Sequence, residues 1–348
     1  MDWTRPRHER FEYLRIDREG ALIGTLGGVT GATISENLNT ALKASGTLTV
    51  TGEADLDDDR VCAVLIAEQD GETAEVVLGT FLASSPRRSR MGPDVITSVE
   101  LYSVLLVLLD DKLESTLTVP SGTDAVVYAR ALVEGAGLTV SVTPDGAAHE
   151  TTVDAVYEAG TPLLDIVNDM LGFAGYSSAG VDGYGRVTIQ PYVDPAGRGP
   201  AWTFRDGDGS VFMPPVADEL DRYDTPNVVV VRCTGPEDAG LIPAVAENND
   251  PASPLSTVSR GRRIVRYEEV SDIESQEALQ AKADLLLLGS TRSVNLGTVR
   301  HTYVPLSIGD AARLDYQEAG IDYRMIVQSR EMELVAGVPT TTVMRRFV

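Results

Sequence analysis

Alternating apolar and polar positions dominate the first ~105 residues and predict a β-rich unit. The segment 10–50 is expected to form strands, with a turn at Glu19-Gly20. Apolar strands then flank Gln69-Asp70-Gly71, and Asp-Gly between two such strands is typical of a tight hairpin. The segment 94–114 predicts another long strand that passes into a short apolar stretch. Glycines at 27–31 predict a flexible turn and not a phosphate-binding loop, because no G-x-G-x-x-G motif and no lysine at Walker spacing is present.

A helical pattern of apolar residues follows this unit. The first helix is expected to start at Thr123 or Asp124, which are good N-cap residues, and to end at Gly135 and Gly137. The segment 138–144 then predicts a strand.

The second helix belongs to the same α+β module. Thr161 is its expected N-cap, Pro162 suits the first helical position, and Gly172 is the expected residue just beyond its C-terminus. Its apolar residues recur at intervals of three and four, so they lie on one face: Leu163, Ile166, Val167, Met170 and Leu171. A strand, an Asp-Gly turn and another strand follow, which predicts a small α+β module over roughly 117–193.

Strand patterns return after a linker rich in Pro and Gly at 194–200. Strands are expected at 201–204, 227–235 and 263–270, and in the last three apolar segments. A helix is expected over 274–290, with Ser275 or Ser271 near its start and Gly289 near its end. The last hairpin is expected to turn at Ala336-Gly337.

The end of the chain repeats the pattern of its beginning. Both 59–103 and 310–347 read Asp, strand, glycine turn, strand with a small residue, charged break, strand. Few residues are identical, so the repeat is one of pattern. It predicts two related β-units that flank the α+β module.

Composition narrows the class of protein. The chain has 348 residues, 43% of them apolar, so about two to four packed domains are expected. The longest apolar run, 104–109, is too short to span a bilayer, and the charged N-terminus predicts no secretion signal, so folding in a cytoplasm is expected. The net charge of −23 argues against a basic surface that grips nucleic acid. The same charge is compatible with a nucleic acid that passes the protein without binding to it.

Candidate chemistry is sparse. His8, His149 and His301 are far apart and lack both local partners and the short ligand spacing of a zinc site, so structural or surface roles are expected. Cys62 and Cys233 each lie in an apolar stretch and are expected to be buried free thiols. We therefore predict no catalytic, cofactor-binding or metal-binding residue and no cofactor.

Acidic segments offer no stronger signal. Those at 55–60 and 205–210 resemble calcium loops, but the twelfth position counted from Asp206 is Ala217, where a glutamate is needed, so solvated turns are expected. The carboxylates of Asp110-Asp111 and 218–221 are too common in so acidic a chain to mark a general acid and base.

The order of these segments resembles the phage baseplate or tail hub family. The same domain begins tail-associated lysins and is related to the hub part of type VI secretion spike proteins. The resemblance rests on the leucine-rich helix and hairpin of 161–192, on the Asn-Val-Val-Val of 227–230, and on Gly309-Asp310 before Leu314. It covers nearly the whole chain, more by the order of elements than by motif.

The resemblance implies a mainly β fold with an α+β insert. Two tail-tube-like β-barrel domains with small peripheral α+β domains would assemble as a trimeric ring. The implied domains are 1–112 (first barrel), 113–195 (peripheral α+β domain) and 196–348 (second barrel, with a peripheral insertion around 235–300).

The implied function is that of a structural virion protein, not an enzyme, at the distal tail tip. The hub would adapt a sixfold tail tube to a threefold tip and line the DNA channel. Its partners would be two further copies, tail-tube proteins above and a tip, fibre or lysin protein below, while DNA and tape-measure protein pass without specific binding. Much of the negative charge is expected to face the channel, although 300–348 holds six acids and six arginines and is not the source of the excess. Because the chain stops at Val348, peptidoglycan cutting is expected on another protein.

Three alternatives remain open. The fold could serve a bacterial contractile injection or secretion machine. An enzyme could use the scattered His149, His301 and aspartates. A receptor- or glycan-binding tip protein could use exposed Tyr176, Tyr184 and Tyr192, of which Tyr184 is the expected contact with an adjacent tail protein.

Overall fold

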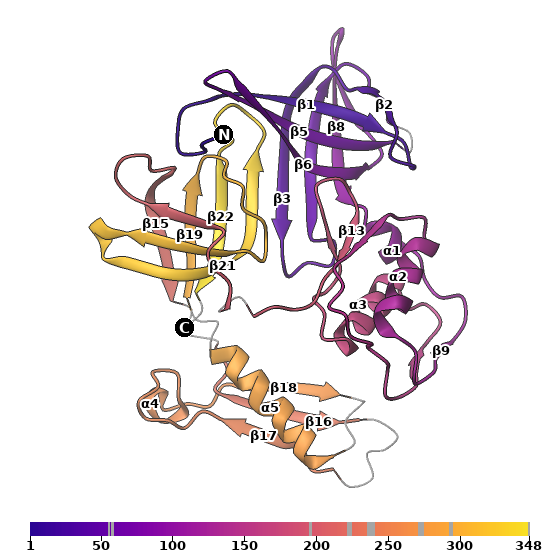
Figure 1. Ribbon diagram of the computed structural model, residues 1–348, viewed down its shortest axis with the longest axis vertical. Helices are drawn as coiled ribbons and strands as arrows, with labels where there is room; N and C mark the ends of the chain where they lie inside the picture. Colours follow the sequence, from indigo (N-terminus) through magenta and orange to yellow (C-terminus); the bar gives the residue numbers. More distant parts are fainter. Residues whose placement is uncertain are drawn as a thin grey trace.

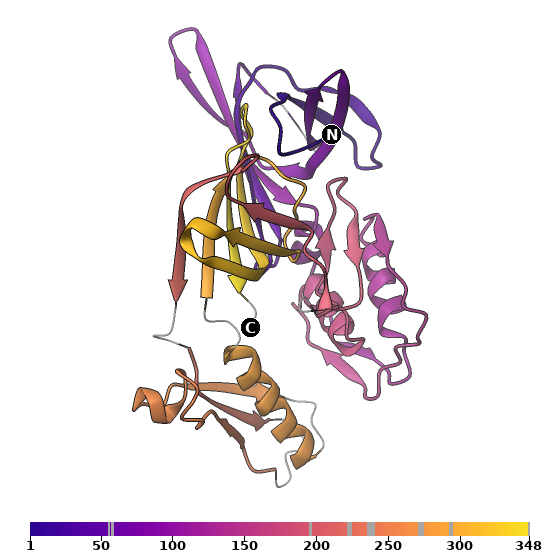
Figure 2. The same ribbon diagram turned by 60° about the vertical axis from the view of Figure 1, so that its left-hand side comes forward.

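The computed structural model describes residues 1–54, 56, 59–194, 197–220, 225–234, 241–270, 275–291 and 295–346. The protein is mainly β, with two helix-containing modules beside the strands (Figure 1). Turning the molecule shows that the strands of the chain's beginning and end lie next to each other (Figure 2).

The first β-unit confirms the strand pattern at the start of the chain. Its strands are β1 (His8–Ile16), β2 (Leu22–Thr25), β3 (Val29–Asn37), β4 (Ala44–Thr51), β5 (Arg60–Gln69), β6 (Glu72–Ala83), β7 (Arg87–Met91) and β8 (Asp94–Ser103). Asp70 and Gly71 have φ angles of 50° and 86°, the left-handed pair that a two-residue hairpin needs, so the predicted turn is confirmed. The flexible turn predicted at 27–31 is wrong from Val29 onward, because there the chain pairs with β4 as strand β3.

The α+β module follows a short helix, α1 (Leu106–Asp110). Its elements are β9 (Leu117–Val119), α2 (Ala125–Gly135), β10 (Val140–Val142), β11 (Ala155–Tyr157), α3 (Leu163–Phe173), β12 (Gly180–Val181) and β13 (Val187–Ile189). The predicted cap of α2 is confirmed, since the Asp124 carboxylate accepts from the amides of Val126 and Val127 at 3.0 Å each. The apolar faces of α2 and α3 share one core with the sheet β10-β13-β12.

Both predicted ends of α3 are wrong. Pro162 is the N-cap, because Thr161 Oγ1 donates back to the Glu158 carbonyl at 2.8 Å, and the first helical amide, that of Leu163, donates to the Asp111 carbonyl at 2.9 Å. A main-chain partner from the residue that follows α1 thus replaces a side-chain cap.

At the other end of α3, Gly172 lies inside the helix. The left-handed residue after the helix is Gly175, with φ 71°. The predicted apolar face is confirmed, since Ile166, Val167, Met170 and Leu171 are fully buried and Leu163 is partly buried.

The second β-unit contains β14 (Trp202–Arg205), β15 (Phe212–Leu220), β19 (Asn295–His301), β20 (Ala311–Tyr316), the 3₁₀ helix η2 (Gln317–Ala319), β21 (Ile321–Glu333) and β22 (Thr340–Arg346). An inserted module between β15 and β19 contains β16 (Val228–Cys233), β17 (Ala244–Glu247), α4 (Thr257–Arg260), β18 (Val265–Val270) and α5 (Gln276–Thr291). Helix α5 packs on one face of the sheet β17-β16-β18.

The predicted start of α5 is confirmed for one of its two candidates. The Ser275 hydroxyl accepts from the amide of Ala278 at 3.2 Å, whereas Ser271 lies outside the described residues. The helix continues past Gly289 to Thr291.

Within the described residues, the strands of both β-units form a single sheet of fourteen strands. In it, the first unit has the order β3-β4-β8-β6-β5-β1 and the second the order β15-β19-β22-β21-β20-β14. Strands at the same position in these two orders are counterparts, and they also follow one another in the same order along the chain. The repeat seen in the sequence at 59–103 and 310–347 therefore extends over six strands of each unit. Among the described residues no pair of strands closes either half into a barrel.

Candidate functional site at the junction of the two β-units

The two β-units are joined edge to edge by main-chain pairing. Strand β21 pairs with β20 up to Ile326 and then, over 329–333, with residues 33–37 of β3. An antiparallel ladder fixes the distance and the register of its strands, so the two units are held in one defined arrangement.

A buried ion pair lies within this ladder. Arg330 stands directly opposite Glu36, and its Nε and Nη2 lie 2.7 and 2.6 Å from Glu36 Oε2. The two side chains are 6% and 18% exposed. Because each charge is largely removed from water, loss of either partner would leave the other buried and unpaired.

The β21–β22 hairpin also contributes to the core of the first unit. Met332, Leu334 and Val338 are buried there among residues of β3, β4, β5 and β8. The amide of Leu334 donates to the carbonyl of Ala32 at 2.9 Å. The last hairpin of the chain therefore completes the first β-unit.

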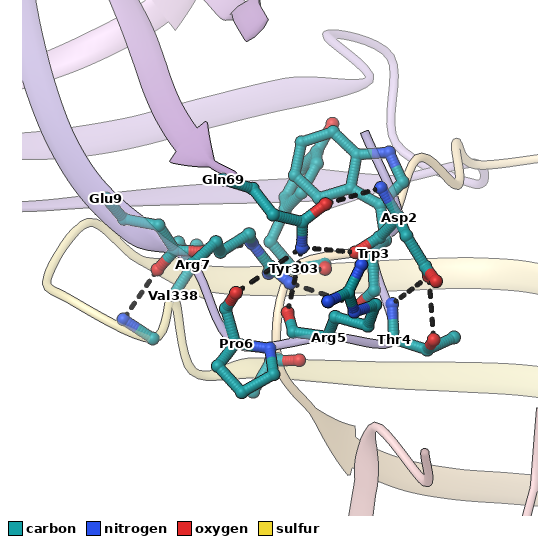
Figure 3. Close-up of polar contacts among 12 residues, drawn as sticks. Asp2, Trp3, Thr4, Arg5, Pro6, Arg7, Glu9, Gln69, Tyr303 and Val338 are labelled. Carbon is teal, nitrogen blue, oxygen red and sulfur yellow. Dashed lines mark hydrogen bonds and ion pairs between the residues drawn. The ribbon is translucent and has the colours of Figure 1, made fainter. Parts of the chain in front are cut away.

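The N-terminal segment forms a second link between the units (Figure 3). Gln69, at the end of β5, holds it through Oε1, which accepts from the Asp2 amide, and through Nε2, which donates to the Asp2 carbonyl, both at 2.9 Å. From this segment Arg7 donates to the carbonyls of Tyr303 and Trp3 at 3.0 Å. The Trp3 and Tyr303 rings meet edge to face, with centroids 5.1 Å apart.

A second buried ion pair completes this link. Arg7 Nε lies 2.7 Å from Glu9 Oε1, and the side chains are 6% and 4% exposed. The other oxygen of Glu9 accepts from the amide of Gly337, in the last hairpin turn, at 2.7 Å. Sequence reasoning missed both ion pairs, because nothing in the sequence around these four residues shows that their charges are removed from water.

The sheet face that turns away from the two cores is polar. One cross-strand row reads Glu333, Thr33, Thr47 and Glu100, and the next reads Glu331, Ser35, Ser45 and Tyr102. We call these eight residues the polar face. Three of them are carboxylates and none is basic. The Thr33 and Thr47 hydroxyls are 2.8 Å apart, and the hydrogen bond from Tyr102 to Glu100 raises the pKa of Tyr102.

A cleft of 640 Å³ lies beside the junction. It is lined by residues of both β-units and of the hairpin β12–β13. Its charged groups have protein partners: Arg330 binds Glu36, Lys43 Nζ donates to the Leu38 carbonyl at 2.7 Å, and Asp310 accepts from the Ser307 amide at 2.8 Å. Burial lowers the pKa of Lys43. Histidine and cysteine are absent from the residues that line the cleft.

The three histidines lie in different parts of the molecule. His301 is fully buried in the second unit, where desolvation lowers its pKa to about 4. The expectation that His149 lacks a local partner is wrong, because its Nε2 lies 2.9 Å from Asp145 Oδ2. His8 is exposed at the start of β1. No group of three or more His, Cys, Asp or Glu side chains suited to a metal ion occurs in the described part of the chain.

The other candidates have structural surroundings. Cys62 and Cys233 are buried and form no disulfide, as predicted, and burial raises the pKa of Cys62. Asp206 accepts from the amide of Glu318 at 2.9 Å, which lowers the pKa of Asp206 and ties the 205–210 turn to η2. Asp110 and Asp111 are exposed.

Parts of the two remaining acidic segments lie outside the described residues. These are Asp55, Asp57, Asp58 and Asp221, together with the side chains of 218–220.

The tyrosines named for glycan contact divide into two groups. Tyr184 and Tyr192 are 67% and 63% exposed, whereas Tyr176 is buried, at 7%. The prediction that all three tyrosines are exposed for glycan stacking is therefore wrong for Tyr176.

No family model matches the sequence, and no curated protein matches it. Solved structures do match over the whole chain. A tail protein from Neisseria meningitidis superposes with a TM-score of 0.70 at 15% identity, covering 98% of this chain and 96% of that one. The 43 kDa tail protein of prophage MuSo2 from Shewanella oneidensis has a TM-score of 0.67 at 14% identity, with 97% and 98% covered.

The chain has the fold of a prophage tail protein. The resemblance seen in the sequence is thereby confirmed at the level of fold. A chain of the Francisella PdpA-VgrG complex is also similar, with a TM-score of 0.59 at 8% identity, covering 99% of this chain and 53% of that one. No helix within the described ranges is both long and apolar enough to cross a membrane.

Proposed function

We propose that this protein is a structural virion component that forms a trimeric hub at the distal end of a phage tail. The observation that carries the proposal is the repeated strand order of the two β-units. Three copies of a chain with two like units present six like units in a ring, while the ring itself keeps threefold symmetry. Such a ring can meet a sixfold tube on one side and a threefold tip on the other.

The proposed domains are 1–112 and 196–348, which become tube-like barrels in the assembly, with 113–195 and the insertion around 235–300 at the periphery. The first β-unit, the α+β module, the second β-unit and the inserted module each have a hydrophobic core of their own, which supports this division. The two ion pairs at the junction would hold the two barrels of one chain in a fixed relation. The whole-chain similarity to tail proteins supports a structural and non-enzymatic role in the virion.

The polar face is our candidate for the channel lining. Hydroxyl groups and three carboxylates would present a wet, negatively charged wall to DNA. Phosphates are repelled by such a surface, so DNA would pass without binding. We propose tail-tube proteins above and a tip, fibre or lysin protein below as partners, with exposed Tyr184 as a contact to an adjacent tail protein.

The test is the mass of the purified chain in solution, followed by class averages in negative-stain microscopy, alone and with its tail partners. A threefold ring with a central hole is the expected result. A chain that stays monomeric with its tail partners would overturn the proposal.

A second candidate is the hub of a bacterial contractile injection or secretion machine. The similarity to a chain of the Francisella PdpA-VgrG complex favours it. Labelling of purified phage particles with an antibody against this chain separates the two. Label at the tail tip supports the virion, and its absence from infectious particles supports the cellular machine.

A further inference from the structure

Comparison of the two β-units shows two strands that, among the described residues, lack the partner that their counterparts have. Within the chain, the edge of β3 pairs with β21. The counterpart of β3 is β15, which among the described residues pairs only with β19. In the second unit the end of β21 forms a hairpin with β22, with Gly337 in its turn. In the first unit β7 forms the corresponding hairpin with β8, with Gly92 in its turn, so β7 is the counterpart of the end of β21. In the described part of the chain β7 pairs only with β8.

A shared Gly-Thr pair fixes how the two units align. Gly46-Thr47 lies in β4 and Gly297-Thr298 in its counterpart β19. Gly46 is needed for close packing, since a Cβ there would meet the Thr33 carbonyl oxygen at 2.4 Å, whereas a Cβ at Gly297 would meet Cε, the flexible end of Met325, at 2.7 Å. The next strands are β8, which pairs with β4, and β22, which pairs with β19. With the two glycines aligned, Thr97 of β8 and Thr340 of β22 are counterparts.

The alignment assigns counterparts on the two free edges. Gly46 stands opposite Ile34 and Gly297 opposite Asp218, so Asp218 is the counterpart of Ile34. On the other edge Thr340 stands opposite Met332 and Thr97 opposite Arg88, so Arg88 is the counterpart of Met332.

Within one chain, Met332 stands directly opposite Ile34. The same register between copies places Arg88 opposite Asp218. In the same register Arg87 would stand opposite Glu219, one position further along each strand, and Ser89 would stand opposite Ala217 on the other side.

We propose that β7 of one copy pairs antiparallel with β15 of a neighbouring copy, with Arg88 opposite Asp218 and Arg87 opposite Glu219. This register places two arginines opposite two acidic residues, and their charges were not used to find it, so the match is independent support for it. Directly opposed unlike charges stabilise an antiparallel pair, and like charges destabilise it. Arg87 and Arg88 are exposed, on a hairpin that projects from the first unit (Figure 2).

The contact is head to tail, so each copy uses β7 on one side and β15 on the other. It would repeat between chains the pairing that β21 and β3 make within a chain, and would cover two otherwise open edges. The inference rests on the proposed ring and names the strands that close it.

The first test reverses the charges. Arg87→Glu/Arg88→Glu and Asp218→Arg/Glu219→Arg should each weaken association about tenfold per contact. The chain carrying all four substitutions should regain association, because every contact again has opposite charges. Arg130→Glu/Arg186→Glu, which reverses two exposed arginines of the α+β module, is the matched control and should leave association unchanged. Sedimentation across a concentration series measures all variants.

The second test measures the register. Ser89→Cys/Ala217→Cys should form disulfide-linked trimers under mild oxidation, because both residues are exposed and predicted to lie opposite each other. Ile23→Cys/Ala217→Cys pairs the same β15 position with the exposed β2 edge and should not link.

The outcomes separate this inference from the proposed ring. A wild-type chain that stays monomeric and does not link at 89 and 217 overturns both. A trimer that is indifferent to the charge reversals and does not link leaves the ring standing and overturns the β7–β15 pairing. Loss of association in both reversed variants, with recovery in the combined one, supports the pairing.

Discussion

Acid should destabilise the second β-unit through His301, because this histidine is neutral and fully buried. Its Nδ1 donates to the Thr302 carbonyl at 2.6 Å, and its Nε2 accepts from the Thr342 hydroxyl at 2.7 Å. The Phe204 ring packs against the imidazole with centroids 4.9 Å apart. A second proton would place a charge in an apolar core and would remove the acceptor that Thr342 uses.

The size of the effect follows from the pKa of His301. Desolvation lowers it from 6.5 to about 4. Below pH 6.5 the unfolded chain therefore binds a proton that the folded chain does not bind until about pH 4. The free energy of unfolding falls through that window, and each tenfold difference in proton affinity is worth about 1.4 kcal/mol, so the total loss approaches about 3 kcal/mol. Above the window this histidine adds no pH dependence, since it is neutral in both states.

Urea denaturation followed by tryptophan fluorescence, at pH values from about 7 to about 4.5, measures this loss. His301→Gln removes the titrating group and keeps a side chain that can donate and accept. The exposed His8→Gln is the control. The wild type and His8→Gln should lose stability in parallel as the pH falls, and His301→Gln should lose about 3 kcal/mol less over the whole window, whatever its stability at neutral pH. Equal losses in all three chains would refute the reasoning.

Three other outcomes are expected. Gly46→Ala should lower the free energy of unfolding by at least about 2 kcal/mol, because its Cβ would lie 2.4 Å from the Thr33 carbonyl oxygen. Gly31→Ala in the same ladder is the control, since its Cβ would meet nothing within 4 Å, and equal thermal denaturation midpoints for the two variants would contradict the prediction. Arg330→Met should lower the free energy of unfolding by about 3 kcal/mol, because it leaves the Glu36 carboxylate buried without its partner. Adding Glu36→Gln should recover part of this loss, and a double variant no more stable than Arg330→Met would contradict a desolvated pair. Replacing the three glutamates of the polar face by lysine should make the assembled protein bind double-stranded DNA in a salt-sensitive way in a mobility-shift assay, and equally tight binding by the wild type would count against a repelling channel.

The sequence by itself determined the features that depend on near neighbours. The Asp70-Gly71 hairpin, the Asp124 cap of α2 and the apolar face of α3 follow from turn geometry, capping and helical spacing, each of which acts within a few residues. The repeated order of strand, turn and charge was also visible, because each unit needs the same alternation to bury one face of its strands.

The tertiary structure decided how the units meet. An unpaired strand edge offers the same row of amides and carbonyls whatever its sequence, so nothing local shows that β21 pairs with β3. The α3 N-terminus is capped by the carbonyl of Asp111 instead of by Thr161, because a helix amide can take a partner from anywhere in the fold. Glu36 and Arg330 are 294 positions apart, and Glu9 and Gly337 are 328 apart. The charges of Glu9, Glu36 and Arg330 look solvated in their own segments, and only folding removes them from water and makes their partners necessary.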